Sequence, residues 1–159
     1  MSHLIYLTLE GSKHGLISSG CSTQDSIGNR YQKGHEDEIQ VLSLNHSITR
    51  NQNTSPQPVQ IVKPIDKASP LLVAAIDSNE VLKAKFTFFR TSANGQLEKF
   101  YEIKLTEASI IDISCVYPNS VNDHESMPYE RIQLKYQSIA WSHLSANTSS
   151  YSISKDNVL

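Results

Sequence analysis

Apolar residues recur at every second position along most of this chain, which is the pattern of β-strands. In the first such segment, Ile5, Leu7 and Leu9 share one face, while Tyr6 and Thr8 lie on the other. The same alternation appears in segments 38–50, 59–65, 83–91, 96–106, 111–117 and 132–143. A chain in which this period dominates folds mainly into sheets.

The phase of the alternation changes near Val41, where a bulge or a two-sided strand explains the change. It changes again near Gln137, where a bulge or bend of the kind that curls a sheet explains it. The one convincing helix covers residues 69–78, with Ser69 as its cap and Pro70 in its first turn. The 159 residues suit one domain, 1–159. We therefore predict a mostly β fold, a small curled antiparallel β-barrel of two packed sheets with one short flanking α-helix.

Asn94-Gly95 separates two predicted strands and favours a tight hairpin turn. A two-residue loop there predicts a register with these opposed pairs: Phe86 and Ile103, Phe88 and Tyr101, Lys85 and Lys104, Arg90 and Lys99. The last two pairs oppose like charges, which costs a few tenths of a kcal/mol each. The hairpin is predicted more firmly than this register.

Two long polar segments interrupt the strands. Residues 11–34 are rich in Ser, Gly, Asn and Gln, and we interpret them as a long loop that serves as a contact surface. Residues 51–58 form a second polar loop, punctuated by Pro56 and Pro58, which we expect to project from the fold.

Charge and hydropathy exclude several classes of protein. Fourteen Lys and Arg against sixteen Asp and Glu leave no basic tract for phosphates, so we expect no nucleic-acid partner. The longest apolar run, 71–76, is far below the ~20 residues of a membrane helix. No signal peptide is apparent at the start, so we expect the chain to begin in the cytosol, with Cys21 and Cys115 more simply reduced than paired.

No motif in the chain predicts catalysis, a cofactor or a metal. The Ser18–Ser22 stretch lacks the spacing of a nucleophile elbow, and Cys21 is more simply an inert thiol than a nucleophile. No pair among the six histidines has the close spacing of metal ligands, although residues 35–38 gather four candidates, and no phosphate loop is present. The aromatic residues of strands 83–91 and 96–106 are explained by a sheet core. We predict that the protein is not an enzyme.

The order and spacing of five stretches resemble the Hcp (haemolysin-coregulated protein) family, over almost the full length of the chain. These stretches are IYLTLEG at 5–11, GHEDEIQVLS at 34–43, KPIDKASPLL at 63–72, YEIKL at 101–105 and YQSIAW at 136–141. The resemblance implies a small β-barrel with a flanking helix. It also implies a structural subunit of the bacterial type VI secretion tube, in which hexameric rings stack into a hollow tube.

The resemblance further implies partners and a route. We expect the sheath and spike components of the apparatus as partners, effector proteins carried in the lumen, and secretion through the apparatus itself. The chain ends at Leu159, so we expect no fused toxin domain. The family uses the extended loop after its long strand to contact the next ring, which predicts a ring-stacking segment of Arg50, Asn51, Gln52, Asn53, Thr54 and Ser55.

Two other functions remain open. A monomeric β-barrel that binds a small ligand would need an apolar cavity inside the fold. A secreted effector enzyme on the same scaffold would need a convergent set of titratable side chains. Residues 50–55 are explained equally well as a solvated connection without any binding role and as the ring-stacking segment.

Overall fold

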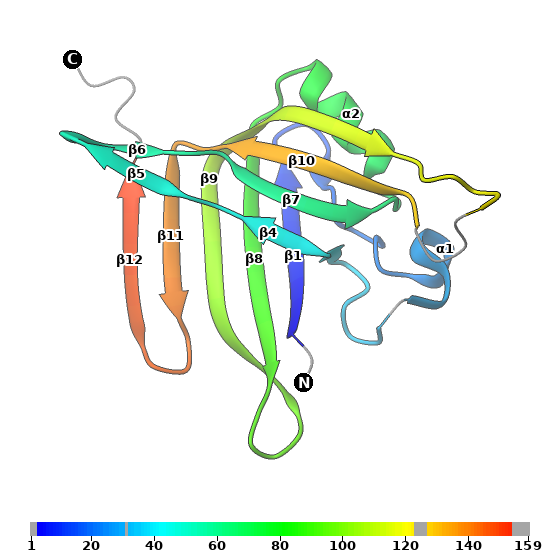
Figure 1. Cartoon of the computed structure of the whole chain (residues 1–159), viewed down its shortest axis with the longest axis horizontal. Coiled ribbons are helices and arrows are strands. Elements are labelled where there is room, and N and C mark those ends of the chain that lie inside the picture. The colour runs from blue at the N-terminus through cyan, green and yellow to red at the C-terminus, as the bar shows by residue number, and fades with distance from the viewer. Residues whose placement is uncertain (1–2, 31, 123–126, 154–159) are drawn as a thin grey trace.

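The computed structural model describes residues 3–30, 32–122 and 127–153, and its antiparallel strands form two sheets packed face to face (Figure 1). The first sheet contains β1 (His3–Gly11), β2 (Gly15–Leu16), β3 (Ile39–Val41), β8 (Leu82–Thr91), the first half of β9 (Leu97–Val116), β11 (Ser138–His143) and β12 (Thr148–Ile153). The second contains β4 (Ser43–Asn45), β7 (Val59–Pro64), β10 (Tyr129–Lys135) and the rest of β9. The mostly β prediction is confirmed.

One long strand belongs to both sheets. β9 pairs with β8 and β11 through its first half and with β10 through its second half. Glu107, at the change of partner, has a positive φ of 49°, and in Figure 1 the strand curves along its length. The prediction of two separate strands, at 96–106 and 111–117, was wrong, because the chain bends here without ending its hydrogen-bonded pairing.

Both phase changes in the sequence mark places where the chain moves from one sheet to the other. β3 pairs with β1, whereas β4, one residue later, pairs with β7, and the intervening Leu42 N–H donates to the Val62 carbonyl at 2.7 Å. Near Gln137, β10 ends and β11 begins, and the two strands pair with different halves of β9. The predicted bend near Gln137 is therefore confirmed, whereas near Val41 the chain changes sheet instead of continuing as a two-sided strand. The single strands expected at 38–50 and 132–143 are both divided.

The core lies between the two sheets and is closed at one end by a helix. Helix α2 (Ser69–Asp77) buries Leu72 and Ala75. Pro70 lies in its first turn as predicted, but Ala68 occupies the N-cap position and Ser69 does not cap the helix. The space left between the sheets and α2 measures about 10 Å³, which is about the volume one water molecule requires. The barrel interior is therefore filled by its own side chains.

The hairpin of β8 and β9 has the predicted register at its base and a different one at its tip. Phe86 pairs with Ile103 and Lys85 with Lys104, as expected. A bulge between Phe88 and Phe89 then shifts the pairing, so that Arg90 lies opposite Glu98. The Arg90 Nε donates to Glu98 Oε1 at 2.9 Å. The shift replaces the expected Arg90–Lys99 repulsion with an ion pair, and a longer turn accommodates the extra residue.

The segment at 11–34 is more ordered than the loop the sequence predicted. It contains β2, the short helix α1 (Gln24–Ile27) and the 3₁₀ turn η1 (Gly28–Arg30). It also buries Ile17, Ser18, Cys21 and Ser22. Much of this segment therefore belongs to the packed structure.

A lysine ammonium lies fully buried where α2 meets β7 and β10. The Lys63 Nζ donates to Glu130 Oε1 at 2.6 Å, to Asp66 Oδ1 at 3.0 Å and to the Pro64 carbonyl at 2.9 Å, which uses its three N–H groups. The Ser69 hydroxyl donates to Glu130 at 2.7 Å and accepts the Asp66 N–H. Ser69 thus links the start of α2 to this ion network instead of capping the helix.

We predict that Lys63→Met destabilises the fold by about 3–5 kcal/mol, because Glu130 and Asp66 would remain buried without their counter-ion. Urea denaturation of the parent protein and the Lys63→Met variant, at the same protein concentration, measures the change in the free energy of unfolding. Lys135→Met, at the exposed end of β10, is the matched control and should change the free energy of unfolding by less than ~0.5 kcal/mol. Equal losses in the two variants would contradict the role assigned to the network.

Candidate functional site

The proposed stacking residues, Arg50 to Ser55, form most of an exposed hairpin. β5 (Ile48–Asn51) and β6 (Asn53–Pro56) pair with each other and form a separate two-stranded sheet. Gln52, at the tip, has a positive φ of 71°. The prediction of an irregular loop was wrong, whereas the hairpin does extend from the side of the molecule away from α1 (Figure 1).

Three polar groups hold the base of this hairpin, which we call the hairpin anchor: His46, Gln57 and Tyr136. The Tyr136 hydroxyl donates to the Gln57 carbonyl at 3.1 Å and lies 2.6 Å from His46 Nε2. Because the single hydroxyl hydrogen points to Gln57, the arrangement is satisfied when His46 Nε2 carries a hydrogen. The residues before and after the hairpin are thus fixed to one side chain between β10 and β11.

Burial shifts the titration of both rings of the anchor. It lowers the pKa of His46 below its ordinary value, although the backbone of Gln57 opposes this. Burial also raises the pKa of Tyr136 to about 12. The ring of His46 also lies against Trp141, with centroids 6.1 Å apart. At neutral pH the anchor is therefore an uncharged, half-buried group of rings.

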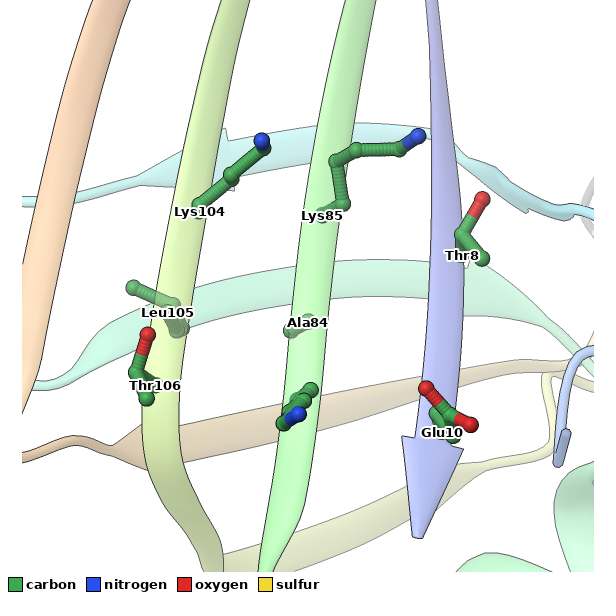
Figure 2. A pocket seen from close by; sticks show the side chains of 8 residues that line it. Thr8, Glu10, Ala84, Lys85, Lys104, Leu105 and Thr106 are labelled. Carbon is green, nitrogen blue, oxygen red and sulfur yellow. The ribbon is translucent and has the colours of Figure 1, made fainter. Parts of the chain in front are cut away.

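A second candidate surface is the side of the first sheet that faces away from the core. There, Thr8, Glu10, Lys83, Lys85, Lys104 and Thr106 surround a hollow of about 260 Å³, which we call the lysine hollow. Figure 2 shows Lys85 and Lys104 on neighbouring strands, with Thr8 and Glu10 on β1. The registers place Lys85 between Thr8 and Lys104. Around the hollow this side of the sheet carries charged and hydroxyl side chains, unlike the opposite face of the same strands, which packs into the core.

The 11–34 segment is fixed to the sheet by a buried carboxylate. Glu80 accepts the N–H groups of Lys13 and His14 at 2.8 and 2.9 Å, and its other oxygen lies 2.5 Å from His14 Nδ1. Burial raises the pKa of Glu80, but these donors outweigh burial and leave it lowered. A Cβ on Gly11 would lie 2.8 Å from the carboxyl carbon of Glu80, so a larger residue at this position would displace the carboxylate from its present place.

The cysteines and the candidate metal ligands of the sequence do not form a catalytic or metal site among the described residues. Cys21 is buried and its pKa is raised to about 12, chiefly by burial, so its thiol does not ionise near neutral pH. Cys115 is exposed, and both cysteines are free thiols. Among the residues that the structure describes, no three His, Cys, Asp or Glu side chains gather as metal ligands. No helix within the described ranges is long and apolar enough to cross a membrane.

A family model described as "Type VI secretion system effector, Hcp" matches residues 6–143. The chain belongs to the Hcp family. The major exported protein of Pseudomonas aeruginosa is 40% identical over 157 residues, which cover 91% of each chain. The uncharacterized protein YhhZ of Escherichia coli K12 is 39% identical over 149 residues, covering 93% of this chain but only 37% of that longer protein.

Solved Hcp structures have the same fold. A crystal structure of an Hcp protein matches with a TM-score of 0.91 at 32% identity, covering 96% of this chain and 98% of that one. The secreted protein Hcp3 from Pseudomonas aeruginosa gives a TM-score of 0.86 at 37% identity, with the same coverage. The resemblance noted in the sequence is confirmed. This member of the Hcp family is a tube or effector protein of type VI secretion, and its exported relatives support secretion.

The hairpin anchor makes a pH-dependent contribution to stability. Because the pKa of His46 is lower in the folded protein than its ordinary 6.5, the unfolded chain binds this proton more readily. The contribution is complete above pH ~6.5 and is lost as pH falls through the folded pKa. When the pH is lowered by about two units, from pH 7.5 to pH 5.5, we expect the melting temperature of His46→Gln to fall less than that of the parent protein.

Thermal unfolding followed by circular dichroism at both pH values measures this difference. Gln retains a side-chain donor for the Tyr136 hydroxyl, so the comparison isolates the titration of the ring. The matched control is His143→Gln, near the end of β11, which should show the pH dependence of the parent protein. Identical pH dependence in the parent and His46→Gln would contradict the prediction.

Proposed function

We propose that this protein is the structural subunit of a type VI secretion tube. Six copies close into a ring, rings stack into a hollow tube, and the tube carries effector proteins in its lumen when it is expelled. The observation that carries the proposal is membership of the Hcp family over residues 6–143 together with 40% identity to an exported relative. The sheath and spike of the apparatus are the further proposed partners, and the bacterial cytoplasm is the proposed place of synthesis before secretion.

The filled interior of the subunit supports a lumen between copies. A pocket for a small ligand usually measures ~300–1,000 Å³, whereas the space between the sheets is about 10 Å³. A carried protein therefore needs a channel enclosed by several subunits. The same comparison disfavours the alternative of a monomeric ligand-binding barrel. Burial of Cys21, which raises the pKa of its thiol to about 12, disfavours this thiol as the nucleophile of an enzyme.

A closed ring needs one patch of each copy to meet a different patch of the next copy, and stacking needs a third contact surface. The hairpin of β5 and β6 suits the stacking contact because it extends from the fold, is exposed and pairs only with itself in the described chain. Its side chains are mostly polar, which fits a contact that forms between soluble rings. We assign stacking to Arg50, Asn51, Gln52, Asn53, Thr54 and Ser55.

We predict that deletion of residues 51–55 leaves rings intact but abolishes tubes, because the deletion removes the tip and leaves the hairpin anchor in place. Native mass spectrometry counts the copies in a ring, and negative-stain electron microscopy detects tubes. Ser120→Ala combined with Asn122→Ala, on another exposed loop, is the control and should leave both rings and tubes unchanged.

Two outcomes would contradict different parts of this proposal. Tubes of normal length in the deletion variant would remove the stacking role of the hairpin. A parent protein that remains monomeric at high concentration would remove the ring itself. A second variant, in which Gly and Ser replace residues 51–55 at constant length, separates the loss of side chains from the loss of reach.

A further inference from the structure

The lysine hollow places two like charges opposite each other, and of the two only Lys104 has an ion-pair partner among the described residues. Lys85 and Lys104 are directly paired across β8 and β9, and Figure 2 shows both side chains on the same side of the sheet. Like charges at opposed positions destabilise a pair of strands. The hollow therefore retains an electrostatic cost within the protein alone.

The same hairpin avoids this cost elsewhere. At its tip, a bulge moves Arg90 away from Lys99 and gives it Glu98 as partner at 2.9 Å. At the hollow, the register is regular, so Lys85 and Lys104 stay opposed. The like-charge pairing is thus removed at the tip and retained at the hollow, where Glu102 partners Lys104 but Lys85 has no ion pair among the described residues.

Few carboxylates of the protein are available to these lysines. Glu102 lies 3.4 Å from Lys104, in an exposed ion pair. Glu10 is the strand partner of Lys83, but the two side chains form no ion pair within 4 Å. Among the described residues, Lys85 forms no ion pair either. Lys83 and Lys85 therefore have no ion pair among the described residues, and Lys104 has only the exposed pair with Glu102, beside Thr8 and Thr106 in the lining of the hollow.

We propose that the lysine hollow binds the carboxylates of an acidic polypeptide segment, the segment by which a carried protein contacts the tube. This proposal rests on the proposed function, because a tube that carries proteins needs a surface that contacts them. Ammonium groups and hydroxyls supply the donors that a carboxylate accepts. In a ring, every copy presents the same hollow, so weak contacts combine through multivalency.

The charges favour a polypeptide over a nucleic acid. Nucleic-acid binding needs clustered cations that follow a continuous run of phosphates, whereas Glu10 and Glu102 interrupt the lysines of this face. The hollow contains no arginine and no aromatic side chain for base stacking. The carboxylates of a bound polypeptide are spaced along its chain, so they can lie beside the lysines without lying next to Glu10 and Glu102.

The test uses fluorescein-labelled hexaglutamate and measures its fluorescence anisotropy with the full chain at low ionic strength. The parent protein should bind the peptide, and Lys85→Gln combined with Lys104→Gln should weaken binding about tenfold, as expected for the loss of two exposed ion pairs. Lys33→Gln combined with Lys135→Gln changes the net charge equally at exposed sites elsewhere. This control should bind within about twofold of the parent.

Three results would overturn the proposal. The first is equal binding by the parent protein and the Lys85/Lys104 variant, and the second is an equal loss in the Lys33/Lys135 control. The third is tighter binding of an oligothymidylate of the same charge than of hexaglutamate, which would assign the hollow to nucleic acid. Hexaglutamine, which is neutral, must not bind.

Native mass spectrometry of the same samples separates this proposal from the proposed function. Rings in every variant with reduced binding only in the Lys85/Lys104 variant support both proposals. Rings without peptide binding overturn the hollow and leave the tube subunit in place. Monomers that bind the peptide through the two lysines retain the site but overturn its assignment to a carried protein.

Discussion

The buried Lys63 ammonium is the interaction on which the rest of the fold depends. It joins β7 to β10 through Glu130 and joins both strands to the start of α2 through Asp66. Two carboxylates share one ammonium, and burial raises the pKa of Asp66 although Lys63 pulls it down. Such a network adds little stability over an apolar replacement. Its directional contacts instead fix where α2 begins, and α2 closes the end of the core.

A domain closed in this way has little internal volume, which favours functions that use its outer surfaces. The two surfaces described above differ in kind. The hairpin of β5 and β6 extends as a separate two-stranded sheet and suits contact with another ring. The lysine hollow lies on the outer side of the first sheet, where the strands are paired over long stretches. The projecting hairpin and the charged hollow thus come from different parts of one fold.

The sequence predicted the strands well because alternation records which side of a strand is buried, and its phase changes near Val41 and Gln137 lie where a change of sheet reverses that side. It missed β12, whose polar residues 148–150 give almost no alternation. It also missed the pairing of β5 with β6, since Asn, Thr and Ser there resemble a loop. Lys63 and Glu80 were not recognised because nothing local distinguishes a buried charge, whose partners lie 67 and 66 residues away.

The direction of the hairpin is set at the place where the chain passes from one sheet to the other, between β10 and β11. Tyr136 lies between β10 and β11, where the chain leaves one sheet for the other, and its hydroxyl holds Gln57 on the far side of the hairpin. The corner that curls the sheets therefore also fixes the base of the projection. A ring-to-ring contact through this hairpin would take its angle from the fold, so polar residues can occupy the tip without loss of orientation.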